Sequence, residues 1–228
     1  MQPRPIAKLR GSFEQRLAAY AMAASASCLG LLASSQPAAA KIVYTKVDQE
    51  LPVDVPFPLD LNDDGIADFS LYFGAGNYGS FAISITPQQT NQVAGYCHRL
   101  SGSCWASALR PGIRVGANLR LGPYNYMVFG GCGFPARQSS SCEGRGPWDN
   151  VQHRYLGFEF FINGKVHYGW ARLDVTLGRT VTPVLTGYAY ETVPNKTLVT
   201  GKTKGPDVIT RERGTLGRLA RGASAARE

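Results

Sequence analysis

The chain has 228 residues, 44% of them hydrophobic, and a formal net charge of +8. Most of that charge lies at the ends: residues 1–40 carry four bases and one acid, residues 202–228 seven bases and three acids, and residues 41–201 13 bases and 12 acids. A nucleic-acid-binding domain needs basic residues clustered on its folded surface. The nearly neutral central segment therefore gives no reason to predict nucleic-acid binding.

Residues 1–40 have the order of a secretory signal peptide. A basic stretch comes first, an uncharged apolar run begins at Leu17, and Ala38 and Ala40 form a small-residue cleavage site. A membrane anchor fits less well, because a spanning helix needs about 20 strongly apolar residues and Ala and Ser dominate here. The sequence predicts cleavage after Ala40 and a secreted, periplasmic or cell-surface protein without a membrane span in its mature chain.

Short segments rich in Val, Ile, Tyr, Phe and Thr alternate with Gly and Pro along residues 41–201. This pattern is typical of an all-β protein, and no segment repeats apolar residues at helical spacing. The main expected strands lie at residues 41–47, 69–73, 80–86, 113–121, 124–129, 155–162, 165–176 and 184–192. We predict one antiparallel β-sandwich or jelly-roll-like domain over residues 41–201 and a basic, flexible tail over residues 202–228.

Four cysteines follow the predicted cleavage site: Cys97, Cys104, Cys132 and Cys142. An even number of cysteines in an exported chain indicates disulfides, and four cysteines allow three connectivities. Gly- and Ser-rich sequence between sequence neighbours favours Cys97–Cys104 and Cys132–Cys142. A zinc site is the alternative, but the spacings are longer than the short pairs of zinc-binding modules.

The clearest local prediction is a β-hairpin centred on Asn163 and Gly164. This residue pair accepts the positive φ angles of a two-residue turn. Such a turn places Phe160 opposite His167 and fixes every pairing outward from it. One face of the hairpin is then apolar and is expected to pack in the core, with His167 as a structural residue and residues 184–192 as a third strand.

The other face of this hairpin combines aromatic and charged side chains: Tyr155, Glu159, Tyr168, Trp170, Arg172 and Asp174. Aromatic rings beside hydrogen-bonding charges suit a carbohydrate or another cell-surface polymer. Ordinary cross-strand pairing on a partly covered sheet explains the same pattern, and the residues favour it, because the pattern has no specific binding signature.

The strongest candidate for a metal site is LDLNDDGIADF, residues 59–69. Oxygen-bearing side chains alternate before a glycine turn, and calcium takes six to eight such ligands in a flexible shell. The predicted calcium ligands are Asp60, Asn62, Asp64, Asp68 and the carbonyl oxygen of Ile66. An acidic turn that binds no metal is the alternative.

The same segment does not match an EF-hand. Leu71 stands where an EF-hand has its bidentate Glu, and the flanking FPLDL and FSLYF read as strands instead of helices. A further ligand would have to come from elsewhere, for example from Asp54 or Asp63.

The sequence contains no recognisable catalytic constellation. Its three histidines form no HExxH motif, and neither a GxSxG elbow nor a phosphate-binding glycine loop is present. The residues favour a non-enzymatic surface or periplasmic protein with a binding or structural role and one structural calcium ion. The alternative is an extracellular carbohydrate-active enzyme that uses the aromatic and charged face.

Three blocks of the sequence, NGKVHYGWARLDV, GYAYETVPNKTLVTGKT and LDLNDDGIADF, resemble a group of uncharacterised secreted bacterial proteins, acidobacterial ones in particular. The YGWxRL and GYAYET blocks and the DxNxDGxxD loop carry this resemblance, which covers most of the chain outside residues 91–150. It implies export and a β-rich fold, and it transfers no activity to any residue.

Overall fold

Strands make up most of the protein. The computed structural model describes residues 41–99, 102–133 and 141–212, all within one compact unit. The elements are β1 (Ile42–Glu50), β2 (Phe57–Leu59), β3 (Phe69–Ala75), η1 (Asn77–Gly79), β4 (Ser80–Pro87), β5 (Gln92–Cys97), β6 (Cys104–Ala106), β7 (Arg114–Val115), β8 (Leu121–Gly122), β9 (Tyr126–Cys132), β10 (Cys142–Arg145), β11 (Val151–Ile162), β12 (Lys165–Leu177), β13 (Val181–Glu191), β14 (Leu198–Val199) and β15 (Val208–Glu212). The signal peptide expected at residues 1–40 lies outside the described residues.

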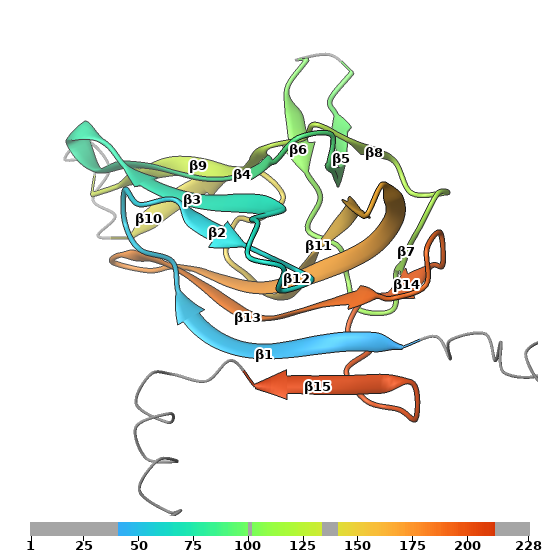
Figure 1. The fold of residues 1–228 in the computed structure, drawn as a ribbon. Helices are drawn as coiled ribbons and strands as arrows, with labels where there is room; N and C mark the ends of the chain where they lie inside the picture. Colours follow the sequence, from blue (N-terminus) through green and yellow to red (C-terminus); the bar gives the residue numbers. More distant parts are fainter. Residues whose placement is uncertain (1–40, 100–101, 134–140, 213–228) are drawn as a thin grey trace, which may run out of the picture. The chain divides into compact units, whose positions relative to one another are not determined.

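Hydrogen bonds join thirteen of the strands in the described ranges into one sheet that curls into two layers (Figure 1). The strand order is β15-β1-β13-β12-β11-β5-β6-β9-β4-β3-β2, with β10 beside β9 and β8 beside β5. In Figure 1 the lower layer contains β12, β13, β1 and β15, and the upper layer contains β9, β4 and β3. The two inner faces enclose the main core.

Strand β5 carries the hydrogen bonding from one layer to the other. Val93, in its first half, pairs with β11, whereas Tyr96, in its second half, pairs with β6. At this corner a Cβ atom on Gly95 would overlap the ring of Tyr124. Glycine is therefore required where the strand changes layers.

The all-β fold predicted from the sequence is confirmed, and its architecture differs in two respects from an ordinary antiparallel sandwich. The two layers belong to one continuous sheet instead of two separate ones. The sheet is also mixed, because β1 pairs in parallel with β15 and β6 in parallel with β9.

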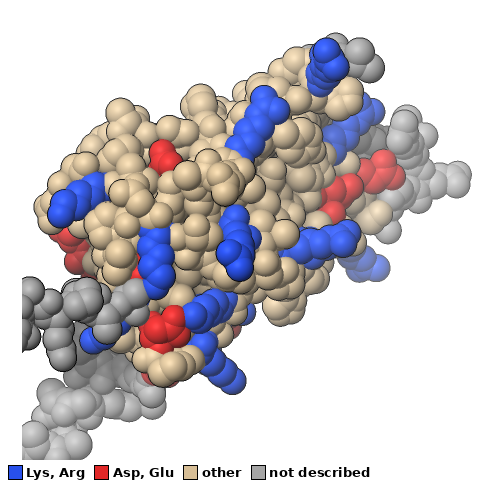
Figure 2. Space-filling view, turned by 90° about the vertical axis from the view of Figure 1, so that its right-hand side faces the viewer, with Lys and Arg blue, Asp and Glu red and all other residues tan. Residues whose placement is uncertain are grey.

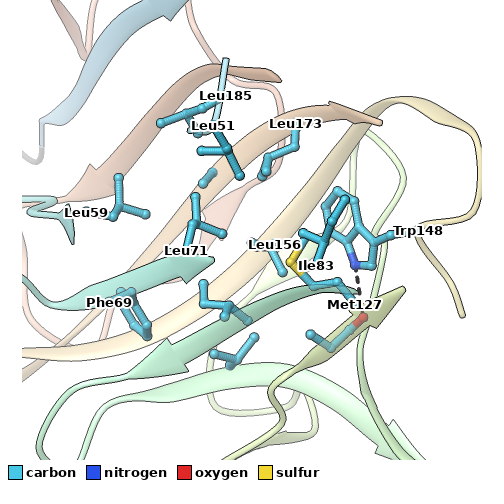
Figure 3. Close-up of a cluster of buried hydrophobic side chains, with 14 of the residues drawn as sticks. Leu51, Leu59, Phe69, Leu71, Ile83, Met127, Trp148, Leu156, Leu173 and Leu185 are labelled. Carbon is cyan, nitrogen blue, oxygen red and sulfur yellow. Dashed lines mark hydrogen bonds between the residues drawn. The ribbon is translucent and has the colours of Figure 1, made fainter. Parts of the chain in front are cut away.

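The main core lies between the layers and is built from alternate residues of the long strands. Figure 3 shows side chains from both layers pointing into it, among them Leu71 and Ile83 from the upper layer and Leu173 from the lower. Each of these three side chains is fully buried. Trp148 is also buried, and its indole N–H donates to the carbonyl oxygen of Ala106 at 3.0 Å, so its single polar atom has a partner.

The predicted hairpin is confirmed from the turn out to Arg154 opposite Leu173, beyond which a bulge shifts the register before Val151. Asn163 and Gly164 form the turn with φ angles of 51° and 72°, and Phe160 lies opposite His167. His167 is buried on the core face, and its Nδ1 atom lies 2.9 Å from the carbonyl oxygen of Glu191. Residues of β13 pair with β12 as the third strand.

Both predicted disulfides are present, Cys97–Cys104 and Cys132–Cys142. Each joins residues that lie directly opposite each other on neighbouring antiparallel strands, β5 with β6 and β9 with β10. The two bonds therefore fix local pairings within the upper layer.

Two sequence predictions about strands were wrong. Residues 113–121 contain only the short strand β7 and the start of β8, because this segment packs across the sheet. The domain boundary expected at residue 201 was too early, because Val208–Glu212 form β15 beside β1. The rest of the predicted tail, from residue 213 on, lies outside the described residues.

Candidate functional site

The acidic segment connects two strands, as the sequence predicts. Strand β2 ends at Leu59 and pairs with β3, which begins at Phe69. β2 is also the last strand at one edge of the sheet. Leu71, at the position where an EF-hand has its bidentate Glu, is fully buried in the core. We call the residues between these strands, Asp60 to Asp68, the acidic loop.

Asp60 organises the acidic loop through backbone hydrogen bonds. Its Oδ1 atom accepts from the backbone N–H groups of Asp63 at 2.7 Å and Asp64 at 3.3 Å, and its Oδ2 atom accepts from Gly65 at 2.8 Å. Asp63 and Gly65 have φ angles of 65° and 88°, which close the turn. Each carboxylate oxygen has two lone pairs, so these bonds leave capacity for a further ligand.

Asn62 leaves one polar atom without a partner. Its Nδ2 atom donates to Oδ2 of Asp64 at 2.8 Å, and Oδ1 of Asp64 accepts from the N–H of Ile66 at 2.9 Å. The Oδ1 atom of Asn62 is buried and accepts no hydrogen bond. A buried oxygen without a partner is unfavourable, and here it lies in a loop that contains four carboxylates.

Asp68 is the most buried carboxylate of the loop, with 8% of its surface exposed. Its Oδ2 atom accepts from the N–H of Leu61 at 2.8 Å. Burial raises the pKa of Asp68 to about 6, and the neighbouring carboxylates of Asp60 and Asp64 act in the same direction, against the opposing effect of the Leu61 hydrogen bond. The loop thus contains negative charge that the protein does not fully compensate.

Residues of β13 and β15 lie close to the acidic loop. Burial raises the pKa of Tyr190 on β13. The cation of Arg211 on β15 opposes this shift, and the loop carboxylates add to it. Arg211 also lies 3.8 Å from an oxygen of Asp63, so Asp63 faces a cation. Asp54 accepts from Tyr72 and from the N–H of Ala75. Neither Asp54 nor Asp63 is therefore arranged as the additional ligand that the sequence left open.

The described residues contain no group of three or more His, Cys, Asp or Glu side chains gathered closely enough to hold a metal ion. A calcium ion at the acidic loop would therefore draw on mixed oxygen ligands: carboxylates, the Asn62 amide and a backbone carbonyl. This donor set is of the hard-oxygen type that calcium takes, and the unpartnered Asn62 oxygen fits it.

The aromatic and charged face is not an open surface, which corrects the ligand-surface prediction. Tyr155, Tyr168 and Trp170 are 4%, 3% and 0% exposed. They form a second hydrophobic cluster with Val115 of β7 and Leu198 of β14, the short sheet that covers them. The aromatic rings contribute to packing and give a ligand no access.

The charged residues of this face have structural partners as well. Arg172 donates to the hydroxyl of Thr186 at 2.7 Å, and Asp174 accepts from the N–H of His153. Burial raises the pKa of Tyr168, and a hydrogen bond with Glu159 adds to this effect. An enzyme that used this face would have no route for its substrate to Trp170.

Basic side chains occur singly on the face that Figure 2 presents. Lys and Arg are spread there among uncharged residues and form no continuous patch.

The fold and the site together define an all-β protein with two disulfides and an acidic loop at one edge of its sheet. No helix in the described part of the chain is long and apolar enough to cross a membrane. No family model, curated protein or solved structure matches the chain.

Proposed function

We propose that this is a secreted, non-enzymatic surface or periplasmic protein whose acidic loop holds a structural calcium ion. The observation that carries the calcium proposal is the buried, unpartnered Oδ1 atom of Asn62. It belongs to a loop in which burial, together with the carboxylates of Asp60 and Asp64, raises the pKa of Asp68. A divalent cation would give the amide oxygen a partner and would compensate the carboxylates.

Calcium at this position would act on the fold and not on chemistry. Leu61, near the start of the loop, is buried in the main core, and the loop also borders β13 and β15 through Tyr190 and Arg211. An ion that ordered the acidic loop would therefore stabilise contacts between the β2–β3 edge and the other layer. Two disulfides support export, because such bonds persist in oxidising compartments.

The test is thermal unfolding of the purified mature chain in excess calcium and in chelator. We expect calcium to stabilise the native state by about 2.7 kcal/mol when its free concentration is a hundredfold above the dissociation constant. Magnesium should stabilise less, because its rigid octahedral shell tolerates a flexible carboxylate loop poorly. Identical melting in calcium and chelator would show that the loop is only an acidic turn.

Two variants separate calcium binding from loop folding. Asp64→Ala should abolish the calcium dependence, since it removes a ligand and a negative charge. Asn62→Ala loses the Nδ2 hydrogen bond to Asp64, so it should lower stability in chelator by about 1 kcal/mol. It should also remove most of the calcium effect, because the unpartnered Oδ1 atom is the proposed ligand. Asp48→Ala, at an exposed position on β1, is the matched control and should retain the full response.

A further inference from the structure

Four aromatic residues form a continuous group on the outer face of the upper layer. Tyr96 of β5 lies opposite Trp105 of β6, and Trp105 lies opposite Tyr126 of β9. Directly paired residues project to the same face of a sheet. Phe129, also on β9, completes the group, because its ring centroid lies 5.5 Å from that of Trp105. We call these four residues the aromatic strip.

The aromatic strip is accessible, in contrast to the buried aromatic face of the hairpin. Tyr96, Tyr126 and Phe129 are 41%, 53% and 44% exposed, and Trp105 is half-buried. The rings of Trp105 and Phe129 are nearly parallel, with 14° between their planes. Neighbouring strands lie about 4.8 Å apart, so the strip spans roughly 10 Å from Tyr96 to Tyr126.

The backbone beneath the aromatic strip is held at both ends. Cys97–Cys104 is the register pair that follows Tyr96 and Trp105, and Cys132–Cys142 ties β9 to β10 beyond Phe129. The indole also packs on backbone, because a Cβ atom on Gly146 would lie 2.6 Å from it. A surface that is fixed before binding loses little conformational entropy when it binds.

The size and charge of the aromatic strip limit its partner. A stable protein interface buries about 800 Å² on each side. An aromatic residue contributes about 150–250 Å² when fully buried. Because all four residues are already partly covered, the strip has less free area than a protein interface needs. The rim is of mixed sign, because Arg145 lies opposite Phe129 and Glu143 lies two residues earlier on the same strand. A narrow, uncharged and hydroxyl-rich chain suits this surface better than a protein or a polyanion.

We propose that the aromatic strip binds a neutral, β-1,4-linked polysaccharide. Such a chain is extended and presents apolar C–H faces, which pack on aromatic rings, and hydroxyl edges, which bond to the phenol groups of Tyr96 and Tyr126 and to the charged rim. A helical, α-1,4-linked chain does not present successive sugar faces to a straight surface. The proposal goes beyond the calcium loop and does not depend on it.

Tryptophan fluorescence tests this assignment directly. The protein has three tryptophans, and Trp148 and Trp170 are both 0% exposed, so a soluble quencher such as acrylamide reaches mainly Trp105. Cellohexaose should protect Trp105 from the quencher in a saturable manner, and maltohexaose, the α-1,4-linked counterpart, should not.

Variants of the exposed strip residues provide the second test. Tyr126→Ala and Phe129→Ala should each weaken cellohexaose binding about tenfold, through the loss of one ring contact. Tyr78→Ala, which removes a tyrosine that is 92% exposed on η1, is the control and should bind as the parent does. Melting curves check that each variant is folded. If a variant is not folded, the protection of Trp105 from acrylamide in the parent protein tests the proposal instead.

Three results would overturn the proposal. They are no protection of Trp105 by cellohexaose, equal protection by maltohexaose, and binding that both strip variants leave unchanged. Binding confined to an acidic polymer, with polygalacturonate as the probe, would also refute the assignment of a neutral chain.

Discussion

At the turn residue Gly164, the effect of the backbone φ angle on stability can be measured without an effect on packing. Its φ angle is +72°, and a Cβ atom built on it would meet nothing within 4 Å. The cost of a side chain at this position is therefore conformational and not steric. Asn163 shares the left-handed conformation, with φ of 51°, which its short polar side chain tolerates.

Gly164→Ala is expected to lower the free energy of unfolding by about 1 kcal/mol, since an L residue is strained at positive φ. Denaturant unfolding of both proteins measures this difference. Gly178→Ala is the matched control, because Gly178 has ordinary backbone geometry and its nearest neighbour lies 3.8 Å from the added Cβ. An equal loss of stability in both variants would contradict the conformational explanation.

At the same scale, two side chains of the acidic loop differ in what they do without calcium. Asp60 accepts three backbone hydrogen bonds, so it shapes the turn whether or not an ion is present. Asn62 differs, because its carbonyl oxygen has no role in that hydrogen-bond network. The contrast makes Asn62 the more specific probe of calcium binding.

At the scale of elements, β15 adds the last strand to the lower layer. It pairs in parallel with β1 from Val208 to Glu212, and Val208 packs on the cluster around Trp170. Lys202 and Asp207 form an ion pair just before this strand. The hydrogen bond from Lys202 holds the pKa of the Asp207 carboxyl below its usual range. The chain is therefore ordered well beyond residue 201.

Truncation tests the contribution of β15. A chain that ends after Asp207 should be less stable by about 1–2 kcal/mol than the full mature chain, because it loses the partly buried Val208 and the hydrogen bonds to β1. A chain that ends after Glu212 keeps the strand and should match the full chain. Equal denaturation midpoints for the two truncations would show that β15 contributes nothing.

At the scale of the whole molecule, the two disulfides lie beside the aromatic strip and not beside the acidic loop. The upper layer contains both bonds within β5, β6, β9 and β10, whereas the loop joins β2 to β3 at the edge of the sheet. The two proposed sites thus lie in different parts of the sheet, so variants can probe each one separately.

Export is the prediction that concerns the whole chain. Amino-terminal sequencing of material secreted by the producing cell should read Lys-Ile-Val-Tyr, because the basic, apolar and small-residue segments place cleavage after Ala40. Strand β1 begins at Ile42, and the carbonyl oxygen of Lys41 accepts from the N–H of Thr192, so cleavage there would leave the sheet complete. Retention in the cytoplasm with Met1 in place would contradict this prediction.

The sequence by itself determined the features that depend on neighbouring residues. The turn at Asn163 and Gly164 gave the hairpin pairings out to Arg154 and Leu173, because a two-residue loop permits one register. The bulge that shifts the register before Val151 was not predicted. The disulfides followed from loop-sized spacing, and the strands around the acidic loop from alternating apolar residues.

Only the tertiary structure decided which surfaces are covered. Trp170 and Trp105 both lie on strands, but β7 and β14 cover Trp170 completely, whereas Trp105 stays partly exposed. The aromatic strip joins the β5–β6 hairpin to β9 through the parallel pairing of Trp105 with Tyr126. No local sequence pattern reveals that pairing. Burial depends on which distant segments pack against a face, and a local sequence pattern does not contain that information. For the same reason the sequence did not predict β15, which becomes a strand by pairing with the distant β1.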